Sequence, residues 1–213
     1  MEADKIILIP SFNELTSLKL ICKKLKKYKL QFLVLDDCSK DGSNKWLKKN
    51  KIKFIKNNKN LGYEKNIING FYKTLHNKKI KYVITFDGDG QHKVNDILKL
   101  IKILNKQDFD LLICDRKNMN RWSEYILSFF FYFKFGIRDP LTGFKIYNIK
   151  VLKKFLKKLS NNHFLVDLVV FIKKSDYKIF NYTIRTKKKT HSRTGENLKI
   201  HFKILKNLKF IFS

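Results

Sequence analysis

Short apolar runs alternate with segments of helical periodicity over the first half of the chain. The runs have the length of buried strands and are KIILI at 5–9, FLVL at 32–35, IKFI at 52–55, YVITF at 82–86 and LLIC at 111–114. Apolar residues three or four positions apart predict helices at 15–28, 67–75 and 97–104, and Asn13 is placed to cap the first. Strands joined by helices in this order predict a Rossmann-like α/β fold, with a mostly parallel sheet flanked by helices.

The pattern is less regular after residue 115. The remaining predicted elements are a turn leading into a strand at 138–147, helices at 149–159 and 164–174, and a strand at 177–184. From Asn197 onward, apolar residues at helical spacing lie among lysines, which predicts a basic amphipathic helix. The chain has neither an internal repeat nor a linker. We expect one domain over residues 1–196, followed by a segment, 197–213, that is a candidate for membrane contact.

Polar clusters follow three of the predicted strands. PSFNE occupies 10–14, DDCSKDGS occupies 36–43, and DGDGQ occupies 87–91. Ligands of open α/β sheets bind outside the carboxyl ends of the strands. The spacing therefore predicts one shared crevice lined by residues from all three clusters.

Composition narrows the class of protein. Of 213 residues, 44% are hydrophobic, which argues against disorder, and no apolar run is long enough to span a bilayer. Acids near Met1 argue against a signal peptide, so we expect a cytoplasmic protein whose three cysteines are reduced. The net charge of +29 predicts attraction to polyanions, but the lysines are spread along the chain, which also suits ordinary solvated faces.

The stretch TFDGDGQ at 85–91 carries the most specific chemistry. Asp87 and Asp89 are one residue apart at the end of a predicted buried strand, where two carboxylates repel each other. In an extended segment these two side chains and Gln91 point to the same side. Oxygen ligands of this kind suit Mg²⁺ or Mn²⁺, which usually also hold substrate phosphates. A surface turn rich in Asp and Gly is the alternative interpretation of the stretch taken alone.

Five motifs in order extend this interpretation over nearly the whole chain, from Ile6 to Leu198. IPSFNE, LDDCSKDGS, NLGYEKNIINGF, FDGDGQH and RDPLTGFK together resemble the family-2 glycosyltransferases, which have the GT-A fold. They are most similar to the polyprenol-phosphate branch, which includes dolichol-phosphate mannose synthase. The resemblance implies an enzyme that uses a nucleoside-diphosphate sugar and a divalent metal.

The resemblance also assigns roles to individual residues. It implies that the nucleotide sugar is bound by residues of the IPSFNE, LDDCSKDGS and FDGDGQH motifs and by two later arginines, with Phe12 standing where tyrosine is usual: Pro10, Phe12, Glu14, Leu35, Asp37, Asp87, Gly88, Asp89, Gln91, Arg116 and Arg193. Asp87, Asp89 and Gln91 match the metal-binding stretch. Arg116 matches an arginine near the transferred sugar and the acceptor phosphate, and Arg193 matches a late arginine that folds over the donor. Catalytic roles are predicted for Asp89, Arg116 and Asp139.

The acceptor decides whether a base is needed. A lipid phosphate already carries negative charge near pH 7, so it requires no strong base. A hydroxyl acceptor requires a carboxylate base, for which Asp139 and Asp167 are the candidates. Each also has a structural interpretation, Asp139 as a turn residue before Pro140 and Asp167 as a buried acid paired with a cation. His92 follows the metal motif and is expected outside the first coordination shell.

An aromatic stretch bears on the location of the protein. YILSFFFYFKF at 125–135 is too short to span a bilayer and is either core or an interfacial element. With the basic tail and the high charge, it predicts peripheral contact with an anionic membrane. However, the segment between Arg116 and Asp139 is shorter than expected for the lipid-phosphate branch.

We therefore expect a metal-dependent inverting glycosyltransferase that moves a hexose from a GDP- or UDP-linked donor to polyprenyl phosphate. Transfer to a hydroxyl of a growing surface glycan, and a protein that binds donor without transferring it, are alternatives. A basic nucleic-acid-binding domain is the alternative from another class. It would explain the charge but not the acids gathered at the strand ends, so we expect no specific nucleic-acid partner.

Overall fold

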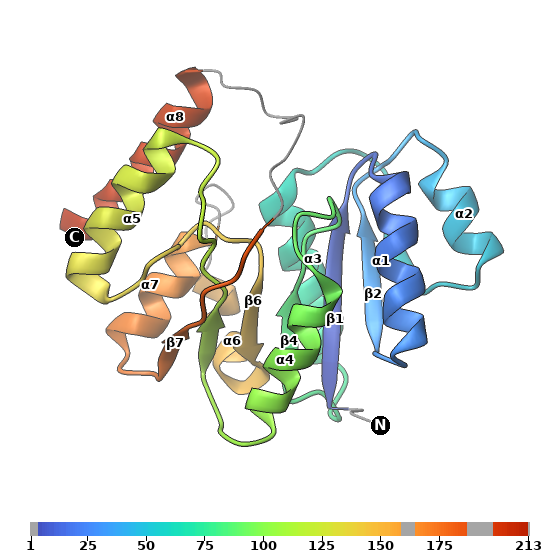
Figure 1. Cartoon of the computed structure of the whole chain (residues 1–213), viewed down its shortest axis with the longest axis horizontal. Helices are drawn as coiled ribbons and strands as arrows, with labels where there is room; N and C mark the ends of the chain where they lie inside the picture. Colours follow the sequence, from blue (N-terminus) through green and yellow to red (C-terminus); the bar gives the residue numbers. More distant parts are fainter. Residues whose placement is uncertain (1–3, 159–164, 187–197, 213) are drawn as a thin grey trace.

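The computed structural model describes residues 4–158, 165–186 and 198–212. Their centre is a seven-stranded sheet in the order β3-β2-β1-β4-β6-β5-β7 (Figure 1). The strands are β1 (Lys5–Ser11), β2 (Phe32–Asp36), β3 (Phe54–Lys56), β4 (Tyr82–Thr85), β5 (Leu111–Ile113), β6 (Lys145–Asn148) and β7 (Ile179–Asn181). The α/β prediction is confirmed.

The sheet is mostly parallel, with one exception. β1 pairs in parallel with both β2 and β4, and β5 pairs in parallel with β7. β6 is antiparallel to both of its neighbours, β4 and β5. From β1 the chain adds β2 and β3 on one side and then β4 on the other. The loops that follow β1 and β4 therefore diverge at the carboxyl ends of these strands and leave a crevice between them. This is the point where such sheets bind ligands.

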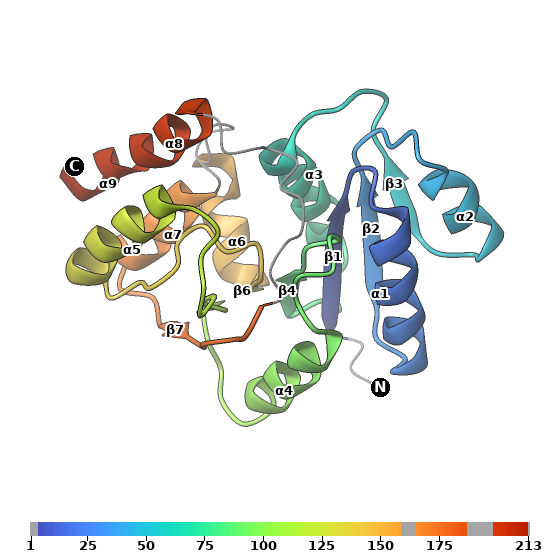
Figure 2. The ribbon, with the colours of Figure 1, turned by 45° about the horizontal axis from the view of Figure 1, so that its top comes forward.

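Helices cover both faces of the sheet (Figure 2). They are α1 (Leu15–Lys27), α2 (Ser43–Lys49), α3 (Tyr63–Leu75), α4 (Val94–Leu104), α5 (Trp122–Phe135), α6 (Ile149–Phe155), α7 (Val166–Lys174), α8 (Leu198–Leu205) and α9 (Lys209–Phe212), with 3₁₀ turns at Leu156–Lys158 and Lys206–Leu208. One apolar core joins α1, α2 and α4 to one face. The other joins the remaining helices to the opposite face. Alternate residues of each strand supply the two cores, as the pleat requires.

Helix α1 shows how the periodicity produced its helix and where the prediction failed. Leu18, Ile21, Cys22 and Leu25 are all buried on one face. The predicted cap at Asn13 is wrong, because Asn13 lies at φ +51° and its side-chain oxygen accepts from the backbone of the β2–α2 loop. The Leu15 amide instead donates to a carboxylate of that loop, Asp41 Oδ2, at 2.8 Å. A residue distant in sequence thus satisfies the helix terminus.

The aromatic stretch forms α5, which lies beside α8 and α9 in both views (Figures 1 and 2). Leu127, Phe131 and Phe135 of α5 are buried in the core. At the contact with α8, Ser123 and His201 share a hydrogen bond of 2.8 Å, and the rings of Trp122 and His201 stack 4.7 Å apart. The C-terminal helices are therefore packed onto the domain. In the part of the chain described, no helix combines the length and apolarity that crossing a bilayer requires.

The three cysteines are free thiols, as expected. Cys22 and Cys114 are buried, and Cys38 is partly exposed. Burial raises the pKa of Cys22 to about 12, even though Lys26 acts in the opposite direction. Burial also raises the pKa of Cys114 well above its usual range. The two buried thiols are therefore unreactive packing residues.

Candidate functional site

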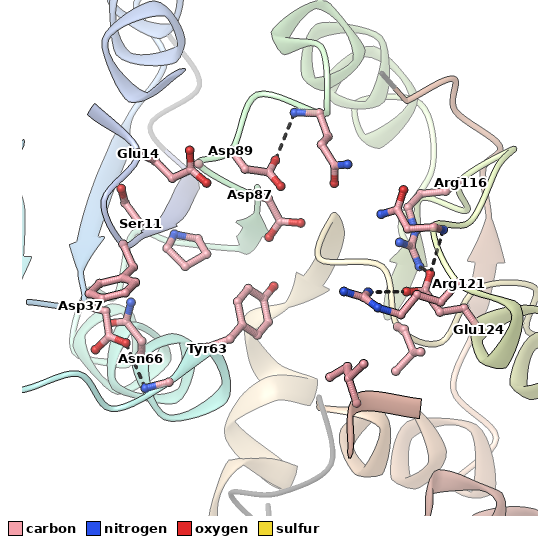
Figure 3. A pocket seen from close by; sticks show the side chains of 18 of the residues that line it. Ser11, Glu14, Asp37, Tyr63, Asn66, Asp87, Asp89, Arg116, Arg121 and Glu124 are labelled. Carbon is pink, nitrogen blue, oxygen red and sulfur yellow. Dashed lines mark hydrogen bonds and ion pairs between the residues drawn. The ribbon is translucent and has the colours of Figure 1, made fainter. Parts of the chain in front are cut away.

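A cavity of about 510 Å³ opens at the carboxyl ends of β1, β2 and β4 (Figure 3). The three polar clusters meet there, so the shared crevice predicted from their spacing is confirmed. Of the predicted site residues, those that line the cavity are Pro10, Phe12, Glu14, Asp37, Asp87, Gly88, Asp89, Gln91 and Arg116. Arg193 lies outside the described residues. The lining carries Glu14, Asp87 and Asp89 on the β1–β4 side, and Arg116 and Arg121 with their shared partner Glu124 on the α5 side (Figure 3).

Asp37 organises one wall of the cavity. Its Oδ1 accepts from the Asn57 side chain and from the Leu61 amide, each at 2.8 Å, and its Oδ2 accepts from the Gly62 amide at 2.9 Å. Asn57 in turn donates to Asn66, which donates to a backbone carbonyl of β2. The carboxylate therefore positions the loop that leads into α3, and its outer edge remains part of the cavity lining.

Leu35 requires a correction. The resemblance placed it in the nucleotide site, but its side chain is 1% exposed and lies in the core beneath α3. A Cβ built on Gly70 would approach Leu35 Cδ1 to 2.4 Å, which shows how closely this side chain packs against the helix. Leu35 is not among the residues that line the cavity, so the structure contradicts a contact of this side chain with the nucleotide.

Two glycines allow the β4 end to approach its neighbours. The Gly88 amide donates to the Pro10 carbonyl at 3.2 Å, and a Cβ on Gly88 would lie 2.8 Å from that oxygen. A Cβ on Gly143 would lie about 2 Å from the Asp87 carboxylate oxygens, at 2.1 and 2.2 Å. A side chain at position 88 would clash with the backbone, and one at position 143 would displace the Asp87 carboxylate. Gly143, from the RDPLTGFK motif, therefore makes the space in which Asp87 sits.

Asp87 is held among polar groups. His92 Nε2 lies 3.6 Å from its Oδ2, and the Tyr63 ring faces the same carboxylate (Figure 3). Burial alone raises the pKa of Asp87, but hydrogen bonding to His92, the charges of His92 and Arg116, and the Tyr63 hydroxyl together lower it below its usual value. Burial and the nearby Asp87 charge raise the pKa of Tyr63, which stays protonated and able to donate. Asp87 is therefore ionised near pH 7.

The same carboxylate has room for a further partner. Asp87 Oδ1 is buried without a hydrogen-bond partner, a costly state for a charged oxygen. Asp89 also lines the cavity, and its Oδ1 accepts from the backbone amide of Gln91 at 3.1 Å. Across the described ranges, no three His, Cys, Asp or Glu side chains converge as a complete metal cage. Two carboxylates with an unsatisfied oxygen fit Mg²⁺ or Mn²⁺, which take one or two carboxylates and complete their shell with substrate phosphates and water.

Arg116 stands on the opposite side of the cavity and is held by two acids. Its Nε and Nη2 donate to Asp139 at 2.7 and 3.1 Å, and Nη2 also lies 3.0 Å from Glu124 Oε2. Burial opposes the charge of Arg116, but Asp139 and Glu124 outweigh it and raise its pKa. The paired Arg116 charge and hydrogen bonds hold the pKa of Asp139 below its usual value despite burial. Within the described part of the chain, Nη1 is the guanidinium nitrogen that takes part in neither of these acid pairs.

The two carboxylates considered as bases do not line the cavity. Asp139 is 1% exposed, and both of its oxygens accept from Arg116. Asp167 is buried in the first turn of α7, where its Oδ1 accepts from the next amide, Leu168. Asp139 therefore holds Arg116 in place. Its catalytic role remains a prediction.

The structure adds residues that sequence reasoning did not select. Tyr63, Arg121 and Glu124 line the cavity, together with Ile200 and Ile204 from the C-terminal helix α8. Arg121 and Glu124 are three residues apart and form an ion pair of 2.9 Å, a spacing visible in RWSE. The contribution of α8 has no local signature, because it depends on a helix far along the chain folding back over the site.

The match to known proteins agrees with this geometry. The family model described as Glycosyl transferase family 2 matches residues 6–148. An uncharacterized protein of Methanocaldococcus jannaschii is 35% identical over 184 residues, which cover 75% of this chain and 79% of that protein. The UDP-N-acetylglucosamine–dolichyl-phosphate N-acetylglucosaminyltransferase of Methanococcus voltae is 26% identical over 241 residues, covering 97% and 96% of the two chains.

Solved structures share the fold at low sequence identity. Glucosyl-3-phosphoglycerate synthase from Mycobacterium tuberculosis, in complex with Mn²⁺, UDP-glucose and glycerol 3-phosphate, superposes with a TM-score of 0.74 at 12% identity. The superposition covers 98% of this chain and 80% of that one. The resemblance stated from the motifs is confirmed: the chain belongs to glycosyl transferase family 2 and is a nucleotide-sugar-dependent glycosyltransferase with the GT-A fold.

Proposed function

We propose that this enzyme transfers a hexose from a UDP- or GDP-linked donor to a polyprenyl phosphate, with inversion at the sugar by in-line displacement. The observation that carries the proposal is the division of one cavity into an acidic side at Asp87 and Asp89 and an arginine side at Arg116 and Arg121. The named activity of the Methanococcus voltae relative, which acts on dolichyl phosphate, supports the choice of acceptor.

The donor belongs on the β1–β4 side. Pro10, Phe12 and Asp37 form the wall for the base and ribose, and Asp87 and Asp89 face the diphosphate. Mg²⁺ or Mn²⁺ held by these carboxylates would neutralise the charge that develops on the leaving diphosphate. The Mn²⁺ in the complexes of the mycobacterial synthase supports the metal in general.

The acceptor belongs on the α5 side. Arg116 lines the cavity there, and arginine binds phosphate oxygens through charge-assisted hydrogen bonds. Asp139 is engaged by Arg116 and Asp167 is outside the cavity, so neither is placed to deprotonate a hydroxyl. A phosphate acceptor needs no such base. This arrangement favours lipid phosphate over a glycan hydroxyl.

The outer face of α5 suits an acceptor carried by a membrane. Its side chains away from the core are aromatic and exposed, with Phe129 at 59% and Phe133 at 73%. In α8 and α9, Phe202 and Phe212 are also exposed, at 64% and 80%. Aromatic side chains beside lysines bind at the headgroup level of anionic bilayers. We propose that α5 and the segment 197–213 rest on the membrane surface, while residues 1–196 carry most of the transfer site.

The test is transfer to farnesyl phosphate from UDP-glucose, UDP-N-acetylglucosamine and GDP-mannose, with Mn²⁺ or Mg²⁺, beside farnesol and free-sugar acceptors. We expect a phosphate-linked product from one donor, lost with EDTA and in Asp89→Ala. Turnover that survives both EDTA and Asp89→Ala would remove the metal from the proposal. Transfer to the hydroxyl acceptors and none to farnesyl phosphate would replace the acceptor.

A further inference from the structure

Glu124 joins the two arginines of the cavity. Its Oε2 lies 3.0 Å from Arg116 Nη2, and its Oε1 lies 2.9 Å from Arg121 Nη1. The backbone amide of Asn120 also donates to Oε2, at 3.3 Å. The residue is 4% exposed, so these contacts are shielded from bulk water and only weakly screened. One carboxylate therefore sets the separation of two guanidinium groups.

The placement of Glu124 connects this pair to α5. It lies in the first turn of the helix, on the side opposite the exposed aromatic residues Phe129 and Phe133. Asp139 fixes the other edge of Arg116 from the loop before β6. Arg116 is thus clamped between two acids from different segments, and its orientation depends on where α5 sits.

We propose that Glu124 is a positioning residue that aligns Arg116 and Arg121 to bind the phosphate of the acceptor. The inference rests on the proposed function, because it takes the acceptor to be a phosphomonoester. Two guanidinium groups at a fixed separation can both donate to the oxygens of one phosphate. Without the bridge Arg116 keeps its contacts with Asp139, but its separation from Arg121 is no longer fixed, and binding then loses the benefit of preorganisation.

The direction in which Glu124→Gln changes phosphate affinity distinguishes a role in aligning the arginines from a simple effect of charge. Glu124 is an anion beside the site for an anion, so removing its charge alone would strengthen phosphate binding. Glutamine keeps the length of the side chain but has one accepting oxygen, and its amide group cannot accept from the second arginine. A weaker affinity in Glu124→Gln therefore reports lost alignment, against the electrostatic trend.

The experiment compares wild type, Glu124→Gln, Glu124→Asp and Glu64→Gln in Mn²⁺-supplemented transfer to farnesyl phosphate, with donor and acceptor varied separately. Glu64 is a matched control, because it lies in the first turn of α3, is 6% exposed and is paired with a lysine, Lys203, at 3.1 Å. We expect both Glu124 variants to raise the acceptor KM about tenfold, equivalent to about 1.4 kcal/mol, with a donor KM within about twofold of wild type. We expect Glu64→Gln to change neither KM by more than about twofold.

The outcomes separate this inference from the proposed function. If wild type uses farnesyl phosphate and Glu124→Gln keeps or lowers the acceptor KM, alignment is refuted and the proposed function stands. If acceptor and donor KM rise together, the role of Glu124 is general support of the fold, and the inference also fails. If wild type binds donor but farnesyl phosphate neither reacts nor binds in calorimetry, the proposed function fails and the inference with it. Should Glu124→Asp not fold, Glu124→Gln alone decides.

Discussion

Replacing Asp139 by asparagine tests whether this residue holds Arg116 or acts as a base. The substitution preserves the shape of the side chain and removes its charge. Asp139 accepts three hydrogen bonds from Arg116, from the backbone amide at 3.2 Å, from Nε at 2.7 Å and from Nη2 at 3.1 Å. An asparagine has one accepting oxygen and turns an amide group toward the guanidinium. The variant therefore leaves a buried cation partly uncompensated.

The size of the effect follows from burial. Removing one partner of a buried ion pair costs about 3 to 5 kcal/mol of unfolding free energy. The lower end, about 3 kcal/mol, applies because Arg116 keeps its ion pair with Glu124. In a domain of this size 1 kcal/mol changes Tm by about 2 to 4 °C, so we expect a fall of roughly 6 to 12 °C. The acceptor KM should rise as Arg116 loses its orientation.

Thermal unfolding by calorimetry or circular dichroism at pH 7 measures the change, and Asp108→Asn is the control. Like Asp139, Asp108 forms an ion pair, with Lys81 at 2.7 Å. Its side chain is 71% exposed, however, so we expect a much smaller change in Tm. A Tm for Asp139→Asn within about 2 °C of wild type, with transfer abolished, would refute the structural role and favour a base.

The pH dependence provides a second check on the same pair. The pKa of Asp139 is lowered in the folded protein, so its contribution to stability is present above the unfolded value, about 3.9. The contribution is lost as pH falls through the lower, folded pKa. The Tm difference between wild type and Asp139→Asn should therefore be full at pH 6 to 7 and narrow below about pH 4. A gap of constant size down to acid unfolding would contradict the ion-pair explanation.

Three further predictions concern other parts of the molecule. His92→Ala should weaken Mn²⁺ binding about 10- to 100-fold in calorimetry with UDP present, because it removes a partner of the candidate metal ligand Asp87. The control His76→Ala, at an exposed position, should leave the affinity unchanged, and equal affinities of the two variants would contradict the prediction. At pH 8 a thiol reagent should modify Cys38 rapidly and the two buried cysteines only after denaturation, so three fast thiols in the folded protein would count against their burial. The double variant Phe129→Ser with Phe133→Ser should weaken binding to phosphatidylglycerol vesicles about tenfold in sedimentation without lowering Tm, and unchanged binding would exclude this face from membrane contact.

Local patterns predicted much of the fold, because apolar runs and helical spacing of apolar residues show which residues of a strand or helix are buried. The apolar run of β1 and the helical spacing of α1 depend only on nearby residues, and both elements formed where expected. The ends of β1, β2 and β4 carry polar residues that have no place in a core, so their meeting at one edge followed from parallel connectivity. The prediction for Leu35 was wrong, because a motif position cannot show whether a side chain lies in the core or lines the cavity.

By itself the sequence determined an α/β domain with its acidic ligands at strand ends, since short-range spacing and residue chemistry contain that information. Only the tertiary structure decided that β6 runs antiparallel, that Asp41 rather than Asn13 serves the start of α1, and that Asp139 is occupied by Arg116. It also brought α8 across the cavity to lie beside α5. Each of these contacts joins residues far apart in sequence, and their partners are selected by packing and by the need to pair buried charges, which no local pattern records.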